Sequence, residues 1–212
     1  MRDMKDSGVP WVEKIPATWT VHPLYVYFTE RKHKNFSGLE SNLLSLSYGK
    51  IVRKDINTSE GLLPESFNTY NIVEAGDIII RPTDLQNDKR SLRTGLVTEH
   101  GIITSAYIAL KPIMPINVAY FHYLLHAFDV MKVFYNMGNG VRQGLNFSEF
   151  KKLMVFEPSL KEQNDIVLLL DEKSTKINAI IAEKKQQIET LNEYKRSLIC
   201  EYVTGKKEVP SP

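Results

Sequence analysis

Apolar and polar residues follow a heptad spacing along the last quarter of the chain. The spacing alternates in steps of four and three, with Lys184 and Lys195 at two positions and apolar or aromatic residues at the other six: Ile177, Ile181, Ile188, Leu191, Leu198 and Tyr202. This repeat keeps one stripe of a helix facing a partner helix. We therefore expect a helix from about Glu162 to Val203, roughly 60 Å long, capped by Asn164 or Asp165 and stopped by Gly205.

The length of the predicted helix exceeds the width of the globular domain that precedes it. The helix cannot bury its apolar stripe against that domain alone, so the pattern favours pairing with another helix, in a second copy of the chain or in a partner. The alternative is a C-terminal helix that folds back over its own domain.

The pattern changes upstream of Pro158, where short apolar runs alternate with turn residues. Residues 73–77 predict a turn and the β-branched residues 78–80 a buried strand. Residues 95–98 and 102–104 indicate a hairpin around a turn at 99–101, and residues 105–110 a further strand. Residues 117–137 have helical spacing and should form a buried or half-buried helix that ends at Gly138.

These elements define a mixed α+β protein with a long C-terminal helix of the coiled-coil type. We expect a globular domain over residues 1–159, a helix over residues 160–205 and a flexible tail over residues 206–212. The single cysteine, Cys200, excludes an internal disulfide and is typical of a reducing compartment. Apolar runs are too short to span a bilayer and the first residues do not form a secretion signal, so a cytoplasmic location without membrane contact is expected.

Motifs for enzyme chemistry are weak. His122 and His126 have the spacing of two zinc ligands, but no Glu lies at the position that a metalloprotease needs and no third ligand is evident. The glycine-rich residues 138–144 match neither a dinucleotide fingerprint nor a P-loop. Acidic and basic residues near residues 171–173 and 183–185 fit charge pairing along a helix. The sequence thus predicts no catalytic residues, no metal and no cofactor in this chain.

The formal net charge of +2 conceals strong clustering. Four segments, residues 31–34, 50–54, 81–93 and 142–152, contain 13 of the 27 basic residues. Residues 160–212 carry no net formal charge. Solvated loop charge would explain each segment singly.

DNA recognition combines Lys and Arg on phosphates with Arg, Asn, Gln and Thr on base edges. On that chemistry, the candidates for contact with bases are Arg81, Thr83, Gln86, Asn87, Arg90, Arg93, Arg142, Gln143 and Asn146. The candidates for contact with phosphates are Lys34, Lys50, Arg53, Lys54, Lys89, Lys151 and Lys152.

Several sequence blocks, taken in order, resemble the DNA specificity (S) subunits of type I restriction–modification systems. They are SGVPWVEKIPATW at residues 7–19, EAGDIII at 74–80, GVRQGLN at 140–146, PSLKEQNDI at 158–166 and LICEYVTGK at 198–206. Each block is weak alone, and the resemblance extends over essentially the whole chain. It differs from the family pattern in having one recognition domain and one helix where such subunits normally have two of each.

The resemblance implies a target-recognition domain for double-stranded DNA, followed by a spacer helix. It implies a non-catalytic subunit that directs a methyltransferase subunit to adenine N6, with S-adenosylmethionine bound on that partner and a restriction subunit as a further partner. With one domain and one helix, it implies a homodimer through the C-terminal helix and a bipartite, palindromic site. Three alternatives remain: a helical assembly module with incidental DNA contact, an inactive remnant of a specificity subunit, and a nuclease with a hidden metal site.

Overall fold

The computed structural model describes residues 2–57, 66–83, 85, 92–137 and 144–210. The chain divides into two compact units, Met1–Asn164 and Asp165–Pro212. The first unit mixes short strands with short helices, and the second continues one long helix. The predicted α+β class with a long C-terminal helix is therefore confirmed.

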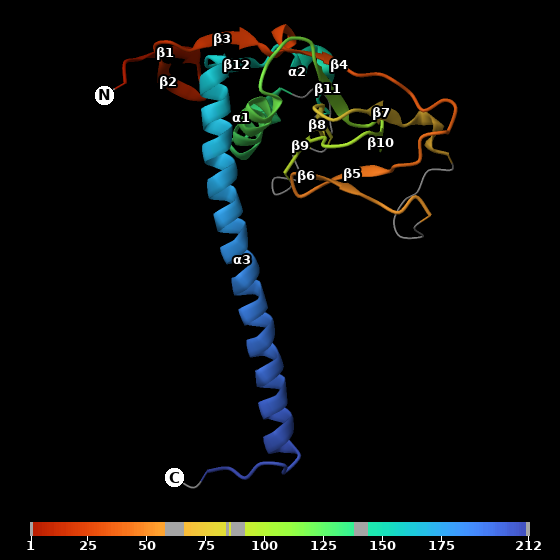
Figure 1. Ribbon diagram of the computed structural model, residues 1–212, viewed down its shortest axis with the longest axis vertical. Coiled ribbons are helices and arrows are strands. Elements are labelled where there is room, and N and C mark those ends of the chain that lie inside the picture. Colours follow the sequence, from red (N-terminus) through yellow and green to blue (C-terminus); the bar gives the residue numbers. More distant parts are fainter. Residues whose placement is uncertain (1, 58–65, 84, 86–91, 138–143, 211–212) are drawn as a thin grey trace. The chain divides into compact units, whose positions relative to one another are not determined.

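The first unit is built mainly from short strands (Figure 1). The strands are β1 (Met4–Val9), β2 (Val12–Pro16), β3 (Thr20–Pro23), β4 (Phe28–Glu30), β5 (Leu44–Ser47), β6 (Lys50–Arg53), β7 (Asn71–Val73), β8 (Ile78–Ile80), β9 (Thr94–Leu96), β10 (Gly101–Ile103), β11 (Ile108–Pro112) and β12 (Met154–Glu157). The α-helices are α1 (Val118–Val130), α2 (Phe147–Phe150) and α3 (Leu160–Val203), and the 3₁₀ turns are η1 (Leu24–Val26), η2 (Phe67–Thr69) and η3 (Val133–Asn136).

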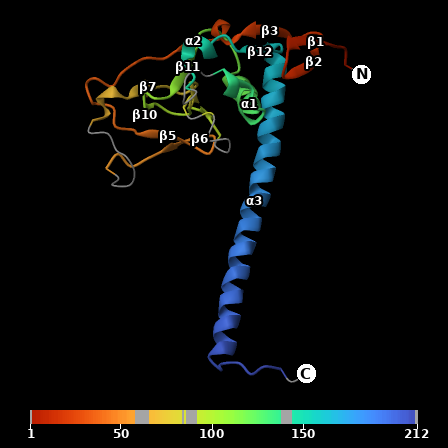
Figure 2. The same cartoon turned by 180° about the vertical axis from the view of Figure 1, so that it is seen from behind.

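The strands form one four-stranded sheet and several two-stranded pairs. The sheet has the order β4-β11-β8-β9, and all its neighbours are antiparallel. The pairs are β1-β2, β3-β12, β5-β6 and β7-β10. The β5–β6 hairpin contacts β9 and β10. Figures 1 and 2 both show it beside β10. Short sheets of this kind need side-chain packing between them for stability.

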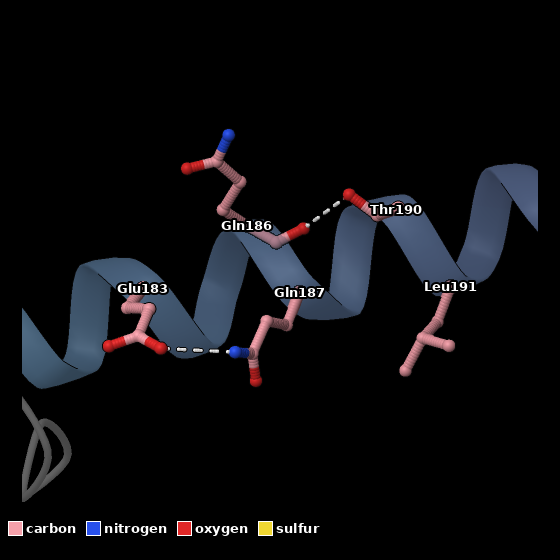
Figure 3. A pocket seen from close by; sticks show the side chains of 5 residues that line it. All are labelled: Glu183, Gln186, Gln187, Thr190 and Leu191. Atoms are coloured by element: carbon pink, nitrogen blue, oxygen red, sulfur yellow. Dashed lines mark hydrogen bonds between the residues drawn. The ribbon is translucent and has the colours of Figure 1, made fainter.

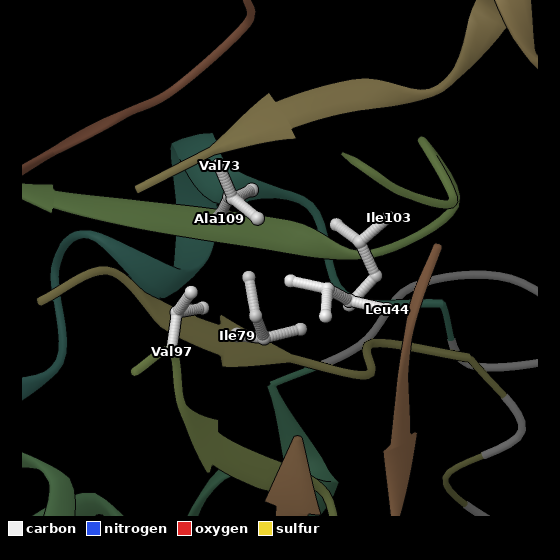
Figure 4. Packing of buried hydrophobic residues seen from close by; sticks show 6 residues of the cluster. All are labelled: Leu44, Val73, Ile79, Val97, Ile103 and Ala109. Atoms are coloured by element: carbon white, nitrogen blue, oxygen red, sulfur yellow. The ribbon is translucent and has the colours of Figure 1, made fainter. Parts of the chain in front are cut away.

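An apolar cluster joins these sheets. Its buried members come from five strands and the segment after β9: Leu44, Val73, Ile79, Val97, Ile103 and Ala109. Figure 4 shows their side chains converging between the strands. The predicted strand at residues 78–80 is confirmed, since all three isoleucines are fully buried. A β-branched run suits a strand that is buried on both faces.

The predicted hairpin over residues 95–104 is wrong. Both strands exist, but β9 pairs with β8 and β10 pairs with β7. The Val97 amide donates to the Asp77 carbonyl at 2.8 Å, and the Gly76 amide donates to the Val97 carbonyl at 2.9 Å. These bonds direct the chain from one sheet to the other, so sequence proximity does not produce pairing here.

Two other predicted boundaries also differ from the structure. The strand expected from residue 105 begins at Ile108, because a turn closes where the Tyr107 amide bonds the Thr104 carbonyl. The helix expected to reach Gly138 ends at Val130, and Lys132 has a φ of 61°. That left-handed conformation stops an α-helix, so η3 is a separate turn.

α3 begins at Leu160, which agrees with the helix predicted over residues 160–205 and lies two residues before the start expected from the heptad pattern. The Ser159 hydroxyl accepts a hydrogen bond from the Glu162 amide at 3.3 Å, so Ser159 supplies the N-terminal cap expected from Asn164 or Asp165. The predicted stop is confirmed, since α3 ends at Val203 and Gly205 has a φ of 71°. Among the described residues, no helix is both long enough and apolar enough to cross a membrane.

Candidate nucleic-acid interface

Two of the four basic segments meet at a backbone hydrogen bond. The Leu145 amide donates to the Pro82 carbonyl at 3.0 Å, which joins residues 142–152 to residues 81–93. Both Leu145 and Pro82 are buried, so the contact is a packed one. Asn146 follows directly and caps α2, its side-chain oxygen accepting from the Glu149 amide at 3.0 Å. The exposed Asn146 side chain, which belongs to residues 142–152, therefore lies near the start of residues 81–93.

The β5–β6 hairpin brings a third basic segment, residues 50–54, close to the C-terminal end of residues 81–93. A Cβ added at Gly49 would lie 3.1 Å from Cδ1 of Leu92. A Cβ added at Gly95 would lie 2.6 Å from Cδ1 of Leu46 and 2.9 Å from Cδ1 of Ile51. Glycine thus permits a close approach of the hairpin to β9. Lys50 and Lys54 are carried by this hairpin and the residue after it.

The remaining basic segment, residues 31–34, borders the same region at a shallow hollow of about 350 Å³. Lys32 and Glu30 line it from the β4 side, together with the turn before β11. Pro82 lines the hollow from residues 81–93, and Asn146 and Lys151 line it from residues 142–152. All four basic segments are therefore linked by direct contacts or a shared surface.

Ion pairs neutralise part of this charge. Lys32 pairs with Glu30 at 2.9 Å, Lys152 with Glu149 at 3.2 Å, and Arg53 with Glu99. The hydrogen bond between Arg53 and Glu99 is the main cause of two pKa shifts. It lowers the pKa of Glu99 and raises the pKa of Arg53. Arg31 is held by Asp77, with Nη2 3.0 Å from Oδ1.

Several lysines of the basic segments form no ion pair with another described residue. Within the part of the chain that the structure describes, no ion pair involves Lys50, Lys54 or Lys151. Lys50 and Lys54 are exposed, and Lys151 is half-buried at the rim of the hollow. Unpaired amines at accessible positions are the groups that bind phosphates most readily.

The other candidate residues stand as follows. Thr83 is exposed and Arg81 half-buried, with the Arg81 amide bonded to the Arg93 carbonyl at 2.8 Å. The Lys34 amine donates to the Thr69 carbonyl at 2.9 Å. The remaining candidates lie outside the described residues: Gln86, Asn87, Lys89, Arg90, Arg142 and Gln143.

Arg93 is a correction to the set of base-contacting candidates. Its side chain is fully buried, and Nε donates to the Tyr135 hydroxyl at 3.0 Å. Nη1 donates to the Thr83 carbonyl, and the guanidinium lies 5.2 Å from the Tyr135 ring centroid. The Arg93 amide donates to Asp129 at 2.6 Å. Arg93 therefore fastens the base of the 81–93 segment to the end of α1, and in this structure it cannot reach a base edge.

A polar contact that the sequence did not point out holds the start of α3 to the first unit. The buried Gln163 accepts from the Asn117 amide at 2.9 Å and donates to the Pro158 carbonyl at 3.0 Å. Trp19 Nε1 donates to Glu162 at 3.0 Å. The detectable signal was the Ser-x-x-Glu pattern at residues 159–162, which is typical of a helix start.

The heptad positions of α3 are on the surface. Ile177, Ile181, Ile188 and Leu191 have 46–64% of their area exposed, Tyr202 has 39%, and Leu198 is half-buried. Figure 3 shows Leu191 beside Glu183, Gln186, Gln187 and Thr190, which border a pocket of about 490 Å³. All five side chains belong to one helix, so they cannot surround a ligand. We therefore treat this region as helix surface.

The two spaced histidines do not form a metal centre with other described residues. Burial, followed by the nearby His126, lowers the pKa of His122 to about 4. His122 is therefore neutral near pH 7, and its ring centroid lies 6.4 Å from that of His126. No group of three or more His, Cys, Asp or Glu residues suited to a metal occurs in the described ranges.

Comparison with solved structures defines the class of fold. No protein-family model matches the sequence, and no curated protein matches it. The HsdS subunit from Thermoanaerobacter tengcongensis is similar with a TM-score of 0.53 and 15% identity, over 83% of this chain and 41% of that one. The chain therefore has the fold of a type I restriction–modification specificity subunit.

A second structure shares this fold over a larger part of the chain. It comes from work on complex assembly and conformational transition of a type I restriction–modification system. The TM-score is 0.59 at 15% identity, over 91% of this chain and 46% of the other. The chain thus spans less than half the length of either structure.

Proposed function

We propose that this protein is a sequence-specific DNA recognition subunit of a type I restriction–modification system, which directs a partner methyltransferase to adenine N6 in a bipartite site. The observation that carries the proposal is the linkage of all four basic segments around residues 81–83 and 144–151. The likeness in fold to a specificity subunit supports the same function.

The division of chemistry among these segments supports DNA as the ligand. Lys50, Lys54 and Lys151 offer amines without ion pairs among the described residues, suited to phosphates. Thr83 and Asn146 offer an exposed hydroxyl and an exposed amide, groups that read base edges. Phosphate contacts position a protein on the duplex, whereas base contacts give it sequence preference.

We further propose that two copies pair through α3. The heptad residues Ile177, Ile181, Ile188 and Leu191 are exposed together on one stripe, which water solvates poorly. A second identical helix offers a complementary stripe. Two identical recognition domains related by a two-fold axis read a split palindrome.

Co-expression with a type I methyltransferase subunit, followed by genome-wide mapping of N6-methyladenine, tests the recognition function. We expect methylation at a split palindromic site. Asn146→Asp keeps the α2 cap but adds a negative charge, so it should abolish methylation while the protein stays folded. Absence of both methylation and duplex binding by the wild type would contradict the proposal.

Sedimentation of the double variant Ile181→Asp, Ile188→Asp tests the pairing. We expect a monomer, because two carboxylates would have to be buried in the seam. The matched control is Ala179→Asp, Gln186→Asp, which adds the same charge seven residues apart on the opposite side of the heptad and should leave the dimer intact. A wild type that dimerises without binding DNA would favour the alternative of an assembly module.

A further inference from the structure

The turn between β5 and β6 has an unusual residue at its first position. Ser47 pairs with Lys50, so the turn contains only Tyr48 and Gly49. Their φ angles are 47° and 77°, both in the left-handed region. Two-residue hairpin turns with two positive φ angles strongly favour Asn followed by Gly. A tyrosine in this conformation is strained, because its Cβ crowds the backbone.

Nothing among the described residues compensates for that strain. Tyr48 has 89% of its area exposed, the largest fraction of any large apolar or aromatic residue in the described chain. Within the described ranges its ring takes part in no aromatic or cation–π contact. A strained residue that gains no ring contact from the described part of its own fold points to a use outside it.

The base of the hairpin is fixed. Leu46 and Ile51 are a cross-strand pair and pack against the core cluster. The turn itself rests on Leu92, which would lie 3.1 Å from a Cβ at Gly49. The opposite face of the hairpin carries Ser47 and Lys50, directly beside the tyrosine. A rigid ribbon therefore presents one aromatic ring, with a hydroxyl and an amine next to it.

This geometry matches a duplex groove. The major groove of B-DNA admits a two-stranded ribbon, and apolar side-chain groups contact base edges such as the thymine methyl there. Lys50 at the next position but one can hold the phosphate at the groove edge. Leu92 directly follows residues 81–91, so the tip lies at the end of the segment with the most candidate base contacts.

We propose that Tyr48 is a DNA-contacting residue whose ring lies against the bases, while Lys50 binds the adjacent phosphate. The proposal rests on the DNA-recognition function proposed above and adds a contact that is aromatic and uncharged. Tyr48 is kept at a cost to the fold, because Asn at this position would suit the turn better.

The test compares Tyr48→Asn and Tyr48→Phe with the wild type by fluorescence anisotropy on a labelled 40-bp mixed-sequence duplex at several salt concentrations. Tyr48→Asn should weaken binding by about tenfold, because the apolar contact of the ring with the base edges is lost. It should leave the slope of log K against log salt unchanged, whereas Lys50→Ala should reduce that slope by about 0.9. Tyr48→Phe should bind as the wild type does.

Thermal unfolding supplies the second readout. Tyr48→Asn should raise the unfolding temperature by about 2–4 °C, because it relieves the turn. Phe36→Asn is the matched control, since Phe36 is 80% exposed in a loop outside the hairpin, and it should not weaken binding. Weaker DNA binding by a more stable variant is a result that a purely structural role for Tyr48 does not produce.

Four outcomes would overturn the inference. Unchanged affinity of Tyr48→Asn removes the DNA contact, and a lower unfolding temperature shows that the tyrosine serves the fold. Loss of co-purifying methyltransferase subunit with unchanged DNA binding assigns Tyr48 to a protein contact. A wild type that does not bind the duplex refutes the recognition function itself, and the inference with it.

Discussion

Substitution of Arg93 by alanine should destabilise the protein. It should leave unchanged the base preference that the proposed function implies. The arginine is fully buried, and its guanidinium serves the Tyr135 hydroxyl and the Thr83 carbonyl. Tyr135 in turn contacts Asp129 at 3.3 Å and Lys132 at 3.0 Å. Asp129 is fully buried, and this burial raises its pKa.

The size of the effect follows from the groups that lose their partner. Alanine leaves the buried Tyr135 hydroxyl without the guanidinium, at about 1–3 kcal/mol, and the part-buried bond to the Thr83 carbonyl is lost as well. The sum agrees with the cost of about 3–5 kcal/mol for removing one member of a buried charged network. In a chain of this length that lowers the unfolding temperature by about 6–20 °C.

Thermal unfolding followed by circular dichroism measures this loss. Arg93→Lys should show an intermediate loss, since an ammonium cannot serve both acceptors in the guanidinium's geometry. Lys50→Ala is the exposed control and should change stability by less than about 0.5 kcal/mol. An Arg93→Ala protein that unfolds at the wild-type temperature but directs methylation to a different site would refute our assignment and restore Arg93 as a base reader.

Two further perturbations test the packing and electrostatics of the first unit. Gly101→Ala should destabilise the protein by about 1–3 kcal/mol in thermal unfolding, because its Cβ would lie 2.5 Å from the Asn42 carbonyl oxygen. Gly144→Ala, with no described atom within 4 Å of the added Cβ, should be neutral, and equal effects of the two variants would contradict the close approach. His100 contacts Glu74 at 2.9 Å and Glu40 at 2.7 Å, and mainly the Glu74 bond raises its pKa above 6.5. The stabilisation from His100 is then complete below about pH 6.5 and lost as pH rises through the folded-state pKa; an NMR titration in which Glu74→Gln fails to lower the His100 pKa would disprove this.

Local patterns predicted those parts of the fold that depend on neighbours in sequence. The isoleucines at 78–80 formed a buried strand, and the heptad repeat formed one helix through Val203. The true partners of β9 and β10, which are β8 and β7, were missed because they depend on the hydrogen bonds that join Val97 to Gly76 and Asp77. Such non-local pairing is not encoded in the alternation of apolar and polar residues.

Residue chemistry predicted the candidate site in part. The basic segments identified from sequence are joined in the structure, but sequence could not distinguish Arg93, which is buried, from Thr83, which is exposed. Both fit a DNA-reading loop by side-chain type. The presence of Tyr135 and Asp129 around Arg93 decides its part, and these residues lie some forty positions further along the chain.

The hydrogen bond between the Arg81 amide and the Arg93 carbonyl closes the base of the intervening segment at 2.8 Å. With its base closed, a change in the length of such an insert acts on stability mainly through closure entropy, and a doubling costs only about 0.6 kcal/mol. Pro82 and Leu85 are described residues of this segment that are buried in the interior. Under the proposed DNA-recognition function, chimaeras that graft another peptide between the two ends of this segment are therefore a practical route to altered specificity.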